Sequence, residues 1–92
     1  MEVKIRFFAK FGEIFGREHL IEVSDGTRII DAIKAVTSRK PEHETVIFDE
    51  SGHFRSFVIV MKNKIRIQHH ETFTLTVSDG DEIVVFPPVA GG

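Results

Sequence analysis

The first quarter of the chain alternates between hydrophobic and polar positions in a way that predicts two strands joined by a helical turn. Residues 3–8 and 18–23 each place apolar side chains at alternate positions, which is typical of a half-buried strand. Between them, Phe11 and Phe15 are four residues apart and Gly16 follows, as expected for one helical turn that ends at a glycine. The two strands are therefore expected to pair as a hairpin.

Residues 28–39 form the one long helix that the pattern predicts. Apolar residues recur there at intervals of three and four, which makes a single stripe along the helix. The stripe consists of Ile29, Ala32, Ile33 and Val36. Thr27 is the predicted N-cap, because its hydroxyl can accept from the first free backbone N–H groups. Pro41 is expected to stop the helix.

The second half of the chain combines a long polar stretch with short apolar runs. Residues 40–56 are predicted to form a loop that residues 46–48 pin to the body of the protein. The continuous apolar run 57–61 predicts a strand that is covered on both faces. The remaining expected elements are a tight turn at 62–64, a return strand at 65–67, a period of two at 73–77 and a last strand at 83–86.

This order of elements predicts an α+β protein with a mixed sheet and one main helix packed on one face. The last strand is apolar on both faces, which favours a central position, parallel to the first strand. That arrangement is the β-grasp, or ubiquitin-like, architecture. We expect one β-grasp domain at 1–86 and an extended tail at 87–92, without internal repeats or linkers.

Composition narrows the class of protein. The chain has 92 residues, of which 41% are hydrophobic, enough for one domain with its own core. There are no cysteines, which excludes disulfides, thiolate zinc sites and cysteine nucleophiles. The net charge of -2 argues against a broad basic surface that would bind nucleic acids. With neither an apolar run of about 20 residues nor a signal-like start, we expect a soluble, cytoplasmic protein that binds no membrane.

Side chains with catalytic or metal-binding chemistry form no convincing constellation. None of the five histidines has a partner at helical spacing, so no metal site is expected. Asp79 and Asp81 flank Gly80 and are read as turn residues. Phosphate-loop and nucleophile-elbow motifs are lacking. The chain is therefore not expected to be catalytic alone.

The C-terminal segment is the strongest functional candidate. Pro87 and Pro88 stiffen the exit from the last strand and prevent further ladder pairing. Val89 and Ala90 follow, and then Gly91 and Gly92. The six residues reach at most about 20 Å, and the two glycines would let a terminal carboxylate enter a narrow channel in another protein. A frayed terminus without function is the alternative reading.

Several segments resemble one family. The sequence from Asp79 to Gly92, DGDEIVVFPPVAGG, resembles the C-terminal signature of the small subunit of molybdopterin synthase, a ubiquitin-like sulfur carrier. Residues 3–9, with Glu13 and Gly16 after them, are similar to that family's first strand and turn. The segment 48–52 is similar to a stretch of its longer members. Archaeal ubiquitin-like modifiers share the fold and the ending, and the thiamine sulfur carrier also ends in two glycines.

The resemblance implies a mechanism centred on Gly92. An E1-like adenylating enzyme would use ATP to activate the Gly92 carboxylate, and a sulfur donor protein would supply sulfur for a thiocarboxylate. The large subunit of molybdopterin synthase would then receive the tail and pass the sulfur to a pterin precursor. This chain itself would bind no cofactor. The alternatives are conjugation of Gly92 to a target lysine, or sulfur delivery for thiamine or tRNA thiolation.

A docking surface is expected on the sheet face that the helix leaves open. Phe86, at the base of the tail, is the first candidate anchor, and Phe8 and Ile65 are expected on the same face. Apolar anchors beside a threaded tail are typical hot-spot residues. The alternative is that all three side chains belong to the core.

Overall fold

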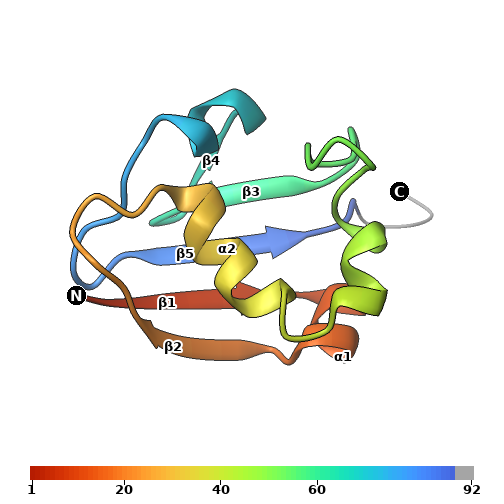
Figure 1. Ribbon diagram of the computed structural model, residues 1–92, viewed down its shortest axis with the longest axis horizontal. Coiled ribbons are helices and arrows are strands. Elements are labelled where there is room, and N and C mark those ends of the chain that lie inside the picture. The colour runs from red at the N-terminus through yellow and green to blue at the C-terminus, as the bar shows by residue number, and fades with distance from the viewer. Residues whose placement is uncertain (89–92) are drawn as a thin grey trace.

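The computed structural model describes residues 1–88 as one sheet with helices packed on it (Figure 1). The strands are β1 (Glu2–Phe7), β2 (Glu18–Glu22), β3 (Ile59–Lys62), β4 (Ile65–Ile67) and β5 (Glu82–Phe86). The α-helices are α1 (Ala9–Phe15) and α2 (Ile29–Thr37), and the 3-10 helices are η1 (Pro41–Val46) and η2 (His69–Phe73). The elements follow the order that the sequence predicts, with η1 and η2 added.

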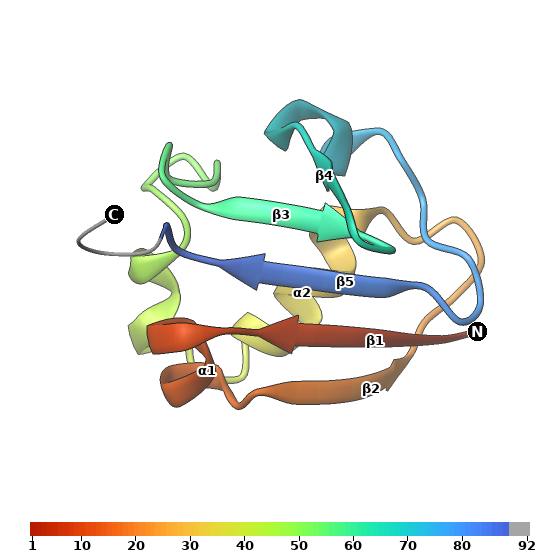
Figure 2. The same ribbon diagram turned by 180° about the vertical axis from the view of Figure 1, so that it is seen from behind.

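The sheet has the strand order β2-β1-β5-β3-β4, so the last strand lies in the centre. β1 and β5 are parallel, whereas β1–β2, β3–β5 and β3–β4 are antiparallel. Helix α2 crosses one face of the sheet, and the view from behind shows the opposite face without a helix across it (Figure 2). This is the β-grasp architecture expected from the pattern.

The core lies between α2 and the covered face of the sheet. Ile5 of β1 pairs with Ile83 of β5, and Val60 of β3 pairs with Val85, so these four side chains point to the same face. All four are fully buried. The predicted helix stripe is also buried, and it consists of Ile29, Ala32, Ile33 and Val36. Burial of one such Ile or Val side chain stabilises the fold by about 1.5–3 kcal/mol.

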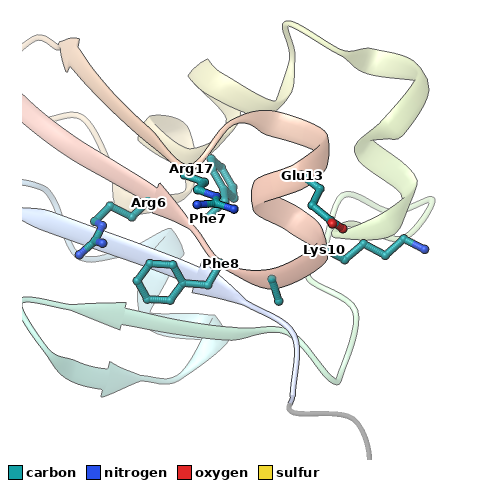
Figure 3. Close-up of a pocket in the computed structure, with 7 residues that line it drawn as sticks. Arg6, Phe7, Phe8, Lys10, Glu13 and Arg17 are labelled. Carbon is teal, nitrogen blue, oxygen red and sulfur yellow. The ribbon is translucent and has the colours of Figure 1, made fainter.

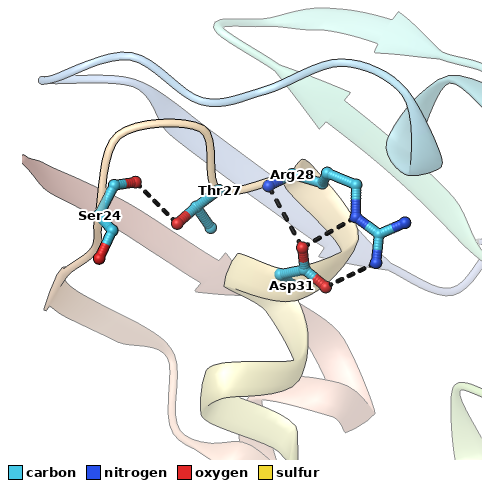
Figure 4. A network of polar contacts seen from close by, with 4 residues as sticks. All are labelled: Ser24, Thr27, Arg28 and Asp31. Carbon is cyan, nitrogen blue, oxygen red and sulfur yellow. Dashed lines mark hydrogen bonds and ion pairs between the residues drawn. The ribbon is translucent and has the colours of Figure 1, made fainter.

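The start of α2 differs from the prediction by one residue. Arg28, not Thr27, occupies the N-cap position, and the Thr27 hydroxyl donates instead to the carbonyl oxygen of Ser24 at 2.7 Å (Figure 4). The Asp31 carboxylate accepts from the Arg28 guanidinium at 2.9 and 3.0 Å and from its backbone N–H at 3.4 Å. This hydrogen-bonded ion pair lowers the pKa of Asp31 and satisfies a free N–H at the helix start.

Two predictions in the second half are wrong. Residues 57–61 are covered on one face only, because Val58 and Val60 are buried while Phe57 is 46% exposed. The period of two at 73–77 forms no strand in the described chain, apart from one bridge between Arg28 and Thr76. The chain enters this segment through η2, where polar side chains such as Thr72, which donates to the His69 carbonyl, satisfy the backbone locally.

The turn at 62–64 is as predicted, and the segment 40–56 is held to the body as predicted, although its first part forms η1. Ile47 and Phe48 are buried, so they hold the long loop against the core. Asn63 and Lys64 have φ angles of 50° and 71°, the pair of positive values that a two-residue type I′ hairpin turn requires.

The Asp81 carboxylate joins this hairpin turn to the turn that precedes β5. It accepts from the Asn63 side-chain amide at 2.9 Å and from the Ser78 backbone N–H at 2.7 Å. Lys62 lies 3.9 Å away. Burial acts to raise the pKa of Asp81, but the two hydrogen bonds and the Lys62 charge together outweigh it and lower the pKa. The ionised form of Asp81 therefore stabilises the fold.

This network predicts a specific pH dependence of stability. Because the folded pKa of Asp81 is lowered, its contribution is complete above the unfolded pKa of about 3.9 and is lost as the pH falls through the folded pKa. Asp81→Asn should lower the free energy of unfolding at pH 7 by about 1–3 kcal/mol. The difference from the wild type should shrink on acidification to pH 2, as measured by urea denaturation. Asp25→Asn, in an exposed turn, is the control; a difference for Asp81→Asn that does not change with pH would contradict the assignment.

Candidate functional site

The central strand β5 ends where the candidate tail begins. Phe86 is the last residue of β5 and is half-buried, Pro87 is half-buried and Pro88 is exposed. We call Phe86–Pro88 the tail root. The predicted tail residues Val89, Ala90, Gly91 and Gly92 lie outside the described residues. The structure therefore defines the surface from which the tail leaves.

Two phenylalanines lie together at the tail root. The backbone N–H of Phe8 donates to the carbonyl oxygen of Val85 at 3.2 Å, which extends the β1–β5 pairing to the end of the sheet. The ring centroids of Phe8 and Phe86 are 6.3 Å apart. Phe8 is 39% exposed. Of the predicted anchors, Phe86 belongs to the tail root and Phe8 borders it, and both remain accessible.

These two residues belong to a larger apolar surface on the open face. Phe86 pairs with Ile59, and Val84 pairs with Met61, so these side chains point away from α2. We call the set the open-face patch, and its members are Phe8, Ile59, Met61, Val84 and Phe86. Phe57, which precedes Ile59 by two residues in the sequence, is also exposed to solvent. The sequence analysis did not assign Phe57, Ile59 and Met61 to a binding surface. The apolar run 57–61 could have indicated them, because a single helix covers only one face of a strand and leaves the apolar side chains of the other face exposed.

Ile65 does not share this face, which corrects the expectation. It pairs with Lys62, and Lys62 pairs with Ile83, whose side chain points into the core. Ile65 therefore points to the α2 side of the sheet, where it is 69% exposed on the edge strand β4. The residue is exposed as predicted, but it lies apart from Phe8 and Phe86.

Arg6 orients the Phe8 ring. Its guanidinium carbon lies 4.7 Å from the centroid of that ring. On either side, Glu18 of β2 and Glu82 of β5 approach the guanidinium at 3.7 and 3.6 Å. A cation over an exposed aromatic ring contributes about 0.5–1 kcal/mol, so this contact favours one position of the ring.

A pocket lies beside the tail root, between the end of β1 and α1 (Figure 3). We call it the basic hollow; its volume is about 530 Å³ and its lining is Arg6, Phe7, Phe8, Ala9, Lys10, Glu13 and Arg17. The Phe7 N–H donates to the Arg17 carbonyl oxygen at 3.0 Å, which ties the backbone at the end of β1 to that of Arg17. Three of the lining side chains are cationic and one is anionic.

The described residues hold no candidate metal centre beside these surfaces. Within 1–88 no group of three or more histidine, aspartate and glutamate side chains is placed to hold a metal ion. No helix in that part of the chain is both long and apolar enough to cross a bilayer. The arrangement can present the segment that follows β5 to another protein, with the open-face patch and the basic hollow beside it.

A β-grasp sheet whose central last strand runs into such a segment places the protein in the ubiquitin-like class. The ThiS family profile matches residues 5–92, and the chain belongs to this family of ubiquitin-like sulfur carriers and modifiers.

Relatives with different roles match the whole chain. It is 33% identical over 95 residues to small archaeal modifier protein 3 of Haloferax volcanii, with both chains fully covered. It is 28% identical over 94 residues to the molybdopterin synthase sulfur carrier subunit of Chlamydomonas reinhardtii, again with full coverage of both. The crystal structure of SAMP1 from Haloferax volcanii superposes with a TM-score of 0.84 at 27% identity, with both chains covered completely.

The close packing of α1 on the end of β1 can be tested by a substitution at Gly12. A Cβ atom on Gly12 would lie 2.5 Å from the Phe7 carbonyl oxygen. Replacing glycine by alanine inside a helix ordinarily stabilises by about 1 kcal/mol. Here Gly12→Ala should instead destabilise the protein by about 1–3 kcal/mol, as overpacking does. The measurement is urea denaturation, and an increase in stability would show that α1 does not lie this close to β1.

Proposed function

We propose that Gly92 is adenylated by an E1-like enzyme and converted to a thiocarboxylate, so that the chain donates sulfur for molybdopterin synthesis as the small subunit of molybdopterin synthase. The observation that carries this proposal is the tail root: the central strand β5 leads directly into Pro87 and Pro88 beside two accessible phenylalanines. The family match that extends through Gly92 supports it.

The chemistry requires activation because a carboxylate is a poor acyl donor. The Gly92 carboxylate attacks the α-phosphate of ATP, which releases pyrophosphate and forms an acyl-adenylate. Hydrosulfide supplied by a sulfur donor protein then attacks the carbonyl carbon, forms the C–S bond and displaces AMP, which leaves a thiocarboxylate without any change of oxidation state. ATP is bound by the activating enzyme, and this chain supplies only its terminal carbonyl carbon. The large subunit of the synthase receives the tail and supplies the catalytic side chains.

The proposed tail suits insertion into a partner. Each proline fixes its φ angle near -65°, which reduces the conformational freedom lost when the tail enters a preformed channel. Gly91 and Gly92 have no side chains that would widen the channel. The reacting group can thus be delivered while the folded domain stays outside.

The open-face patch is the docking surface in this proposal. Phe8 and Phe86 serve as anchors at the tail root, and Ile59 and Met61 extend the apolar contact along β3. The activating enzyme and the large subunit both have to bind next to the tail, so one patch at the tail root serves both. Ile65 contributes nothing to this contact because it points to the other face.

The second candidate function is protein modification. The 33% identity to small archaeal modifier protein 3 favours it. In that case the activated Gly92 forms an isopeptide bond with a lysine of a target protein. Sulfur delivery for thiamine or tRNA thiolation is a further variant of the carrier function. All of these functions share the adenylation step.

Intact mass measurement of protein isolated from its native cell distinguishes these fates. The carrier function predicts a sulfur-for-oxygen mass shift confined to the C-terminal peptide, with few diglycine remnants on lysines of other proteins. A variant with one alanine added after Gly92 should show neither product, and its melting temperature should be unchanged. Abundant conjugates without a thiocarboxylate would favour the modifier. Adenylation of the extended variant without prior processing would contradict both.

Phe86→Ala tests the docking surface. Truncation of a hot-spot anchor should weaken binding to the adenylating enzyme by about 2 kcal/mol or more. The stability cost should be smaller than for Phe7→Ala, because Phe7 is fully buried and such a core truncation costs about 3–5 kcal/mol. Calorimetric titration and urea denaturation measure the two effects. Unchanged affinity with a large loss of stability would make Phe86 an ordinary core residue.

A further inference from the structure

The basic hollow stands out against the charge of the whole chain. The protein carries 14 acidic and 12 basic residues, yet cationic side chains predominate in the lining of this pocket. They are Arg6 from β1, Lys10 from α1 and Arg17 from the connection to β2, with Glu13 as the only acid in the lining. The hollow is therefore a local positive site on a protein of net negative charge.

Two of these cations are available to a ligand. Within residues 1–88, neither Lys10 nor Arg17 makes an ion pair or a side-chain hydrogen bond, and both are exposed. The Lys10 side chain extends outward from α1 and away from Arg17 in Figure 3, so a segment of several residues is needed to reach both cations. Arg6, by contrast, already lies between Glu18 and Glu82. Lys10 and Arg17 are thus the residues with unused charge.

The walls of the hollow are preformed. Gly12 holds α1 against the Phe7 carbonyl, and Gly16, at φ 94°, turns the chain back towards β2. The hydrogen bond from Phe7 to the Arg17 carbonyl then fixes the backbone of Arg17. A ligand that binds here does not have to order the backbone, which lowers the cost of binding.

Phe8 connects the hollow to the tail root. Phe8 lines the hollow, and its ring lies beside that of Phe86. Its backbone N–H donates a hydrogen bond to the carbonyl oxygen of Val85. A protein that docks on the open-face patch and receives the tail is therefore brought to the mouth of the hollow.

We propose that the basic hollow binds a carboxylate-bearing segment of the adenylating enzyme that activates the tail, with Lys10 and Arg17 as its ion-pair partners. This inference rests on the proposed delivery of the tail to a partner. Phosphate groups of ATP are the less suitable ligand, because a threaded tail carries its reacting end away from the root. Electrostatic contacts at the rim of an interface raise the association rate and select the partner.

The enzymatic test uses ATP–pyrophosphate exchange by the adenylating enzyme encoded in the same genome. Lys10→Glu and Arg17→Glu should each raise the KM for the protein about tenfold at low salt, with kcat unchanged. The effect should diminish as salt increases. Lys64→Glu, in the exposed turn at the other end of the sheet, changes the net charge equally and should leave KM unchanged. Equal effects of Lys10→Glu and Lys64→Glu would overturn the proposal.

A second measurement does not depend on the enzyme. If the wild-type chain is not adenylated, the proposed function fails, and the hollow is tested by titrating the isotope-labelled protein with a triglutamate peptide. Amide shifts should concentrate at the hollow-lining residues and disappear in Arg17→Glu. Shifts spread equally over the turn at Lys64 would overturn the site. A stronger response of the same amides to inorganic pyrophosphate would overturn the carboxylate assignment.

Discussion

The parallel pairing of β1 with β5 is the constraint on which the rest of the structure depends. It brings the first and last strands of the chain together in the centre of the sheet, with Ile5 opposite Ile83 in the core. Because parallel strands end at the same edge, the residue after β1 and the residue after β5 become neighbours. The position of Phe8, α1 and the basic hollow beside the tail root follows from this pairing.

A sheet with one long helix has one face to bury and one to expose. The residues on the covered face alternate regularly with those on the open face, so Val85 is buried while Phe86 remains accessible. Val84 is nevertheless largely buried on the open side, since β5 has a neighbouring strand on each edge. The open face is thus apolar near its centre and charged around it, a distribution typical of protein interfaces.

Much of the fold could be predicted from the sequence because its pattern is regular where the core is. The stripe of α2, the alternation of β1 and the apolar run of β5 each follow from a single periodicity. The predictions failed where local hydrogen bonds or register decide the outcome. Arg28, which forms an ion pair with Asp31, occupies the N-cap position that was predicted for Thr27. Ile65 lies on the opposite face from the predicted one because the two-residue turn pairs it with Lys62.

The candidate site was less predictable than the fold for a related reason. The sequence identifies Phe8 and Phe86 as neighbours of the tail, since both are adjacent to strand ends. It does not place Lys10 and Arg17 in the lining of one hollow, because that arrangement depends on the close approach of Gly12 to β1. Contacts of this kind are made by backbone shape and leave no periodic signal.

The central position of β5 also determines how the domain responds to tension on its end. Hydrogen bonds flank β5 on both sides; they are slanted in the parallel pair with β1 and perpendicular to the strand in the antiparallel pair with β3. A force along the axis of β5 therefore loads both rows of bonds in shear at once and cannot open them one after another from an edge. The turn network around Asp81 holds the far end of the same strand. The domain is consequently held against a pull along the axis of β5.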